Sequence, residues 1–158
     1  KQPELPVVID ADGLNLLAKK RLYSTLGRQY VLTPHLREMS RLSGKSVQEI
    51  ADDMTSAVMG QQAGATIVLK DARTLVSDGD WLYINLSGNS ALSTGGSGDV
   101  LSGMIGGLLA QGCTQRTAAT LAVYMHGLTA EQYCESALPH CMLARDILEM
   151  IPKIGGNS

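Results

Sequence analysis

A glycine-rich stretch followed by one acid is the part of this sequence best suited to chemistry. Residues 93–98 carry no bulky side chain, and Asp99 comes directly after them. An apolar pattern with helical spacing then follows at Val100, Leu101, Met104, Ile105, Leu108 and Leu109. A glycine-rich loop that opens a helix lets backbone N–H groups approach an anion, and the helix dipole favours negative charge there. The stretch therefore predicts a phosphate site where Asp99 accepts a proton from an attacking hydroxyl.

The same stretch also fits a purely structural interpretation. Glycine-rich turns often precede helices, and Asp is favourable in the first turn of a helix because it complements the dipole. Judged on these residues alone, the phosphate site and the structural turn stay equally open.

Two aspartates follow the first apolar run of the chain. Residues 5–9 predict a buried strand, and Asp10 and Asp12 stand at its end. In open α/β sheets, ligands bind at the carboxyl ends of the strands. The two acids could therefore hold a magnesium ion or a substrate hydroxyl. They could also cap the helical turn at 14–18, and the cap is the interpretation that we favour.

A histidine lies at the next junction of strand and helix. Residues 30–32 predict a second strand, Thr33 a helix cap, and Pro34 the first helical position. His35 is then expected in the first turn, where the helix dipole disfavours a positive charge on the ring. A lone histidine is more often packed or solvated than functional, but at this junction a neutral imidazole could contact a ligand. Another histidine, His126, is expected to be a satisfied core residue.

A third group of polar residues follows the strand predicted at 65–69. Lys70 and Arg73 could bind phosphates as charges, with the Thr74 hydroxyl alongside. However, residues 75–76 and 81–86 resemble antiparallel strands, which would make this segment part of a solvated hairpin. From the residues alone, the hairpin is the favoured interpretation.

The remaining elements alternate strands with helices, which predicts α/β layers. Ser46 and Glu49 have the spacing of a capping box for a helix expected to continue to about Gly64. Further helices are expected at 117–133, with Leu121 facing inward, and at 142–151, with Leu143 and Leu148 facing inward. The chain begins at Lys1 and reaches a ligand-facing strand end at once, so we expect an N-terminally truncated domain.

Composition excludes several classes of protein. The 158 residues are 44% hydrophobic and 18% charged with a net charge of −2, which indicates one globular domain over 1–158. Neither nucleic acid nor a membrane surface is an expected partner, and no apolar run reaches the roughly 18 residues of a membrane span. Three cysteines without C-x-x-C spacing favour a reducing cytoplasm over a disulfide framework or a metal site.

Several motifs together resemble one family, the ADP/ATP-dependent NAD(P)H-hydrate dehydratases of the ribokinase-like superfamily. The matching segments cover nearly the whole chain and are 10–17, 33–42, 68–70 with 73–74, 87–89, 94–103, 122–127 and 143–147. The resemblance implies a ribokinase-like αβα sandwich with a mostly parallel sheet, of which this chain is the C-terminal portion. It also implies an antiparallel strand pair near residues 74–86.

The resemblance also implies roles for individual residues. Asp99 resembles the acid that activates the substrate hydroxyl and contacts the hydrated nicotinamide, and His35 resembles a substrate contact. The residues of this chain that resemble the family's nucleotide-binding positions are Lys70, Asp71, Ala72, Arg73, Thr74 and Gly98. Position 71 departs from the family pattern, since Asp stands where the family usually has Gly. No residue is implied as a direct metal ligand.

Family membership would imply a repair reaction. Members convert NADHX and NADPHX, the hydrated forms of NADH and NADPH, back to the reduced cofactors. They use ADP in the bacterial type and ATP in the eukaryotic type, commonly with Mg²⁺, and bacterial members often form homo-oligomers such as tetramers. Two alternatives stay open at this point: a vitamin-precursor kinase of the same superfamily, and a non-catalytic nucleotide-binding module.

Overall fold

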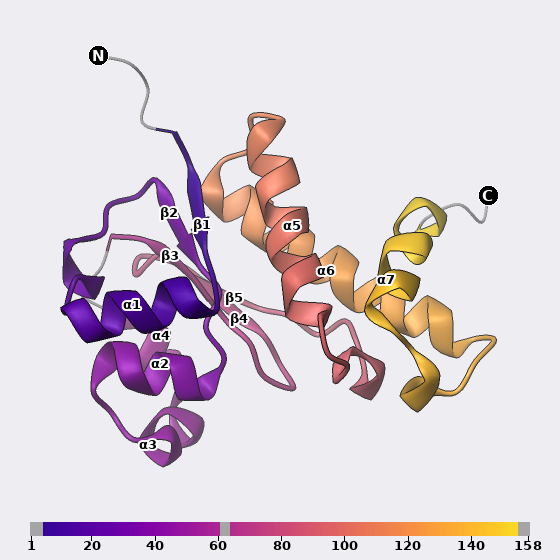
Figure 1. Ribbon diagram of the computed structural model, residues 1–158, viewed down its shortest axis with the longest axis horizontal. Coiled ribbons are helices and arrows are strands. Elements are labelled where there is room, and N and C mark those ends of the chain that lie inside the picture. The colour runs from indigo at the N-terminus through magenta and orange to yellow at the C-terminus, as the bar shows by residue number, and fades with distance from the viewer. Residues whose placement is uncertain (1–4, 61–63, 155–158) are drawn as a thin grey trace.

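The computed structural model describes residues 5–60 and 64–154, and a five-stranded sheet lies at its centre (Figure 1). The strands follow chain order across the sheet as β1 (Val7–Ile9), β2 (Tyr30–Leu32), β3 (Thr66–Leu69), β4 (Leu75–Ser77) and β5 (Leu82–Ile84). β1, β2 and β3 pair in parallel, whereas β4 pairs antiparallel with both β3 and β5. The antiparallel pair expected near 74–86 is therefore confirmed.

One face of the sheet is covered by the helices that lie between β1 and β3 in the sequence. These are α1 (Asp12–Lys20), α2 (Leu36–Ser43) and α4 (Met54–Met59), with α3 (Val47–Asp52) packed against α2 and α4. Leu32, Ile67 and Leu69 point from the sheet into this layer and belong to one buried apolar cluster with Leu14 and Met39. Burial of these side chains removes apolar surface from water and holds the layer in place.

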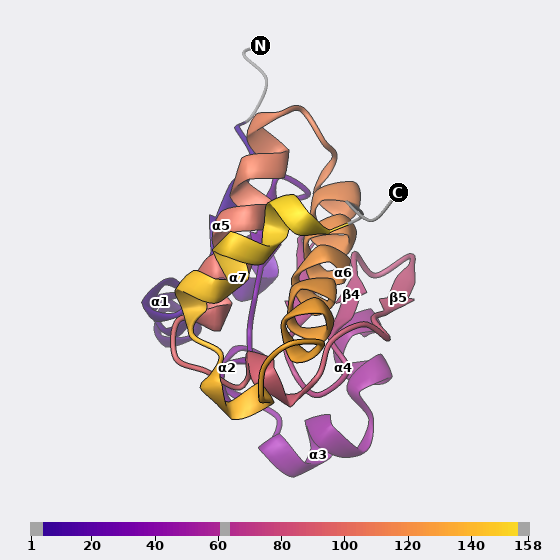
Figure 2. The same ribbon diagram turned by 90° about the vertical axis from the view of Figure 1, so that its right-hand side faces the viewer.

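The opposite face is covered by α5 (Ser97–Ala110) and α6 (Gln115–Cys134), with α7 (Ala144–Met150) packed against both helices (Figure 2). Val31 and Val68 alternate with the residues of the first face, as strand geometry requires, and they pack against Leu101 and Ile105 of α5. The molecule is therefore an αβα sandwich, as predicted. None of the helices in the described residues is long and apolar enough to span a bilayer.

The prediction of one helix from Ser46 to about Gly64 was wrong. The capping box is present, since Ser46 Oγ accepts from the Glu49 amide at 3.2 Å and Glu49 Oε2 accepts from the Ser46 amide at 2.7 Å. However, the backbone leaves the helix at Asp53, where φ is −143° and ψ is 75°. The Asp53 side chain then caps α4 by accepting from the Ser56 amide at 2.9 Å. Local capping therefore divides the segment into α3 and α4.

Three leucines expected to face inward are exposed instead. Leu121, Leu143 and Leu148 keep exposed fractions of 38%, 49% and 54%, whereas Ile147 of α7 is fully buried. α6 buries its small residues against α5 and the sheet, because short side chains let the two helices approach closely. Leu121 is consequently left on the outer side of α6, whereas Leu143 precedes α7 and Leu148 lies on its exposed side.

Candidate active site

The carboxyl ends of the three parallel strands bring polar residues from distant parts of the sequence to one edge of the sheet. Asp10 follows β1, and an isolated parallel bridge joins His35, after β2, to Lys70, after β3. The Lys70 amide donates to the Pro34 carbonyl at 2.8 Å, which extends the parallel pairing past the strands. The backbone itself therefore holds His35 and Lys70 side by side.

The N-terminus of α5 faces the same edge. Gly96 precedes the helix with φ at 86°, a left-handed conformation that favours glycine, and a Cβ there would lie 3.1 Å from Ala144 Cβ. No described side chain caps this terminus. The first N–H groups of a helix have no partner within the helix, so this terminus is suited to bind an anion.

A cavity of about 800 Å³ opens between the sheet edge and α5. Most of the nucleotide and substrate positions predicted from the sequence line it, namely His35, Lys70, Asp71, Ala72, Thr74 and Gly98. Arg73 and Asp99 are exposed and do not belong to its wall. Asp99 follows Gly98 in the first turn of α5, and no described residue forms a hydrogen bond or ion pair with its carboxylate. Its catalytic role stays a prediction.

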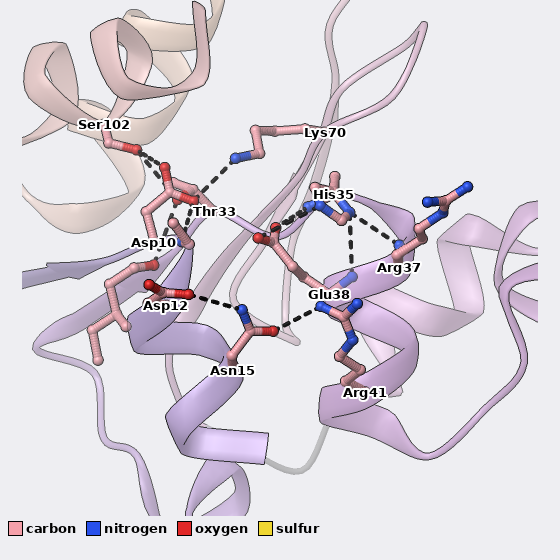
Figure 3. Close-up of polar contacts among 12 residues, drawn as sticks. Asp10, Asp12, Asn15, Thr33, His35, Arg37, Glu38, Arg41, Lys70 and Ser102 are labelled. Atoms are coloured by element: carbon pink, nitrogen blue, oxygen red, sulfur yellow. Dashed lines mark hydrogen bonds and ion pairs between the residues drawn. The ribbon is translucent and has the colours of Figure 1, made fainter. Parts of the chain in front are cut away.

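Contrary to the expectation from the sequence, Asp10 does not cap α1. The N-terminus of α1 has no capping side chain among the described residues, and Asp12 only accepts from Asn15 Nδ2 at 3.3 Å. Asp10 instead lies between Lys70 Nζ, 3.0 Å from its Oδ1, and Ser102 Oγ, which donates to its Oδ2 at 2.6 Å (Figure 3). Burial raises the pKa of Asp10, but the Ser102 hydrogen bond and the Lys70 charge together hold that pKa below its ordinary value.

The cap of α2 is His35 and not Thr33. His35 Nδ1 accepts from the Arg37 amide at 3.1 Å and the Glu38 amide at 3.3 Å, so this ring nitrogen carries no proton. Glu38 completes a capping box by accepting from the His35 amide at 2.9 Å, and its Oε1 lies 3.5 Å from His35 Nε2. The Thr33 hydroxyl turns instead toward Ser102 Oγ, 3.3 Å away. His35 is therefore a structural cap that also lines the cavity.

His126 was expected to be a satisfied core residue, and this is confirmed, but it also belongs to the cavity wall. Only 7% of His126 is exposed, and its Nε2 lies 3.1 Å from the Ser97 carbonyl and 3.2 Å from Ser97 Oγ. Because a carbonyl only accepts, Nε2 must carry the proton. Burial lowers the pKa of His126 to about 4, and the positive charge of Lys70 acts in the same direction. The ring is thus a neutral donor that fixes the start of α5.

The sequence predicts no individual role for the residues of the opposite wall of the cavity, although it singles out segments 87–89 and 93–98. This wall includes Asn85, Ser87, Gly88, Asn89, Ser90, Ser93, Thr94 and Val123. Asn85 is buried and accepts from Ser87 Oγ at 3.0 Å, while Gly88 and Asn89 are tied to α6 through Glu131 and the Ala130 carbonyl. The small polar residues directly after β5 are the one signal that could have indicated a binding loop.

Comparison with known proteins identifies the family. The sequence profile of the NAD(P)H-hydrate dehydratases matches residues 1–153. This chain belongs to the NAD(P)H-hydrate dehydratase family. It is 46% identical over 138 residues to the ADP-dependent (S)-NAD(P)H-hydrate dehydratase of Neisseria meningitidis, an alignment that covers 84% of this chain and 47% of that protein.

Solved structures agree with the family membership. The ADP/ATP-dependent NAD(P)H-hydrate dehydratase of Bacillus subtilis, co-crystallised with ATP and Mg²⁺, superimposes with a TM-score of 0.83 at 31% identity. That superposition covers 96% of this chain and 54% of the other. A ribokinase-like superfamily protein from Enterococcus faecalis gives a TM-score of 0.79 at 28% identity, covering 98% of this chain and 53% of that one. The fold is thus ribokinase-like, and the chain spans about half the length of these dehydratase relatives.

Proposed function

We propose that this chain takes part in the nucleotide-dependent dehydration of (6S)-NAD(P)H hydrate to NAD(P)H, with ADP giving AMP and phosphate. The observation that carries the proposal is the cavity where Lys70 and His35 meet the uncapped N-terminus of α5. A cavity of about 800 Å³ is within the range of small-molecule sites. Membership in the dehydratase family supports the choice of reaction.

The chemistry requires that a poor leaving group become a good one. Hydroxide leaves the hydrated nicotinamide ring slowly, whereas a phosphate ester at the same carbon leaves readily as the ring nitrogen supplies electrons. Asp99 would take the hydroxyl proton while that oxygen attacks the terminal phosphorus of the nucleotide, and AMP would depart from ADP. Phosphate and a ring proton are then lost, and the carbon–carbon double bond is restored.

The surrounding residues would stabilise charge and need no covalent step of their own. N–H groups in the first turn of α5 would donate to the transferred phosphoryl oxygens. Lys70 would neutralise phosphate charge, and the segment from Asp71 to Thr74 together with Gly98 would hold the nucleotide. His35 would contact the hydrated nicotinamide from the neighbouring strand end.

Mg²⁺ fits this site as a partner of the nucleotide. No three His, Cys, Asp or Glu side chains gather into a metal-binding group within the described residues. Mg²⁺ commonly takes most of its protein-site ligands from phosphates and water, with one or two carboxylates. Asp71 is the carboxylate on the cavity wall and would be its contact. When bound, the ion would offset phosphate charge.

We also infer the domain organisation, the oligomeric state and the cellular compartment of the protein. Residues 1–158 would act as one unit of a larger ribokinase-like domain, because helices from both halves of the chain cover the same sheet. A homo-oligomer in the cytoplasm is the expected form, and a tetramer is the state to look for by light scattering.

The test is conversion of NADHX by the complete natural protein, with ADP and with ATP in separate reactions. Recovery of NADH absorbance with release of inorganic phosphate supports the proposal. Accumulation of a stable phosphorylated product would instead indicate a kinase, and nucleotide binding without turnover would indicate a binding module.

Asp99→Asn tests the proposed base. Asparagine keeps the size of the side chain but cannot take the proton, so turnover should fall roughly 10²–10⁴-fold. ADP binding should persist, because a negative charge near the phosphates has been removed. Near-normal turnover would mean that Asp99 is only a first-turn residue of α5, and the fold assignment would be unaffected.

A further inference from the structure

Asp10 links three elements that meet at the cavity but is not itself part of the cavity wall. Figure 3 shows its carboxylate between the side chains of Lys70, from the end of β3, and Ser102, from α5. Oδ1 accepts from Lys70 Nζ at 3.0 Å and from the Ala11 amide at 2.8 Å, and Oδ2 accepts from Ser102 at 2.6 Å. Three donors on two elements and the adjoining backbone therefore fix both carboxylate oxygens.

Lys70, by contrast, lines the cavity, and its ammonium lies against the first turn of α5. A Cβ placed on Gly98 would be 3.3 Å from Lys70 Nζ. The N-terminus of a helix carries a partial positive charge, so an ammonium at this position is unfavourable without a counter-charge. Asp10 supplies that counter-charge. The pair is partly buried, with exposed side-chain fractions of 22% for Lys70 and 16% for Asp10, so solvent screens it only in part.

The Ser102 hydroxyl orients the Asp10 carboxylate. Ser102 lies four residues after Gly98 in α5, and therefore on the same side of the helix, one turn further along. Its hydroxyl proton is directed to Asp10, while the Thr33 hydroxyl donates to the Ile9 carbonyl at 3.5 Å and lies 3.3 Å from Ser102 Oγ. Asp10 thus accepts from Ser102 of α5 and from Lys70. The start of α5 and the ammonium are tied to the same carboxylate.

We propose that Asp10 is a positioning residue, which holds the Lys70 ammonium at the N-terminus of α5 ready for a nucleotide phosphate. This inference rests on the proposed nucleotide-dependent function. An ammonium already held in place needs no ordering when the phosphate arrives, and pre-ordered charges stabilise developing charge most effectively. Asp10 does not border the cavity, whereas Lys70 does, so the proposed effect of Asp10 on the nucleotide is exerted through Lys70.

A double-mutant cycle in the complete natural protein tests this dependence directly. Asp10→Asn, Lys70→Met and the combination of both are compared for the Kd of ADP by calorimetry and for kcat and KM in NADHX conversion. Asp10→Asn should weaken ADP binding about tenfold, because a mobile lysine must then be ordered on binding. The same change made in the Lys70→Met protein should weaken ADP binding less than twofold.

Additive effects of the two substitutions, or tighter ADP binding by Asp10→Asn, would overturn the proposal. Because the Kd is measured without turnover, the cycle gives its answer even if NADHX proves not to be the substrate. Failure of NADHX conversion together with a non-additive cycle would refute only the reaction, and Asp10 would remain the residue that positions Lys70.

Two further variants separate positioning from folding. Ser102→Ala keeps the Asp10 charge but removes the hydrogen bond that orients it, so it should weaken ADP binding a few-fold, and only when Lys70 is present. Asp12→Asn is the matched control, because Asp12 is exposed and, among the described residues, its carboxylate is hydrogen-bonded to Asn15 of the same helix alone. It should leave ADP affinity unchanged. Equal effects of Asp12→Asn and Asp10→Asn would mean that the contacts around Lys70 are irrelevant to binding.

Discussion

The stability of this protein should depend on pH through His126. The ring is buried and donates from Nε2 to the Ser97 carbonyl, and burial lowers its pKa from 6.5 to about 4. At a pH between these two values the unfolded chain binds a proton that the folded chain does not. Acid therefore favours the unfolded state. The contribution is fully present above pH 6.5 and is lost progressively as the pH falls toward 4.

The size of the effect follows from the same two values. A pKa of about 4 in the folded protein, against 6.5 in the unfolded chain, corresponds to a loss of about 3 kcal/mol of folding free energy. Typical domains have only about 5–15 kcal/mol in total, so the loss is easily measured.

The assay is urea unfolding of the wild-type protein and His126→Gln, at several values from about pH 7 to pH 4. Glutamine can still donate to Ser97 but does not titrate. Carboxylates that also titrate in acid are shared by both proteins and cancel in the difference. The wild type should lose about 3 kcal/mol relative to His126→Gln across this range. A difference that is constant with pH would show that His126 is equally protonated in both states, and would refute the argument.

Two other predictions concern the walls of the cavity. Gly127→Ala should destabilise the fold by about 2 kcal/mol or more in thermal unfolding, because the new Cβ would lie 2.6 Å from the Ser87 carbonyl carbon. Gly103→Ala should be neutral or slightly stabilising, because no described atom outside its chain neighbours and its own helix backbone lies within 4 Å of the new Cβ. His35→Asn should keep the α2 cap, and hence the melting temperature, since Asn can accept from the Glu38 amide. If His35 makes the proposed substrate hydrogen bond, its loss should lower kcat/KM about tenfold, and unchanged kinetics would reduce His35 to a cap.

Local signals in the sequence were sufficient where the physical cause was local. Ser46 and Glu49 form their predicted capping box, and Gly44 ends α2 in the left-handed conformation that glycine adopts without strain. The turn around Gly79 joins β4 and β5 as expected, because turn residues between apolar runs determine a hairpin. Each of these features depends on residues only a few positions apart.

Predictions failed where two candidate partners competed for one side chain. Asp10 could cap the neighbouring helix or pair with a distant cation, and it pairs with Lys70, 60 positions away. Thr33 is a good cap by type, but its hydroxyl contacts Ser102 while His35 takes the capping position. The sequence alone shows the donors and acceptors available, not which of them the fold brings within 3 Å.

Patterns in the sequence predict the layers of this protein and the polar residues available at its strand ends. Alternating apolar runs indicate α/β layers, and the glycine-rich stretch indicates where α5 begins. Which of the polar residues meet at that edge depends on the packing of the whole fold. Parallel pairing sets the ends of β1, β2 and β3 side by side, and burial against α5 then turns Asp10 toward Lys70 and His126 toward Ser97. These contacts join residues far apart in the chain, so their energies depend on packing that no local pattern encodes.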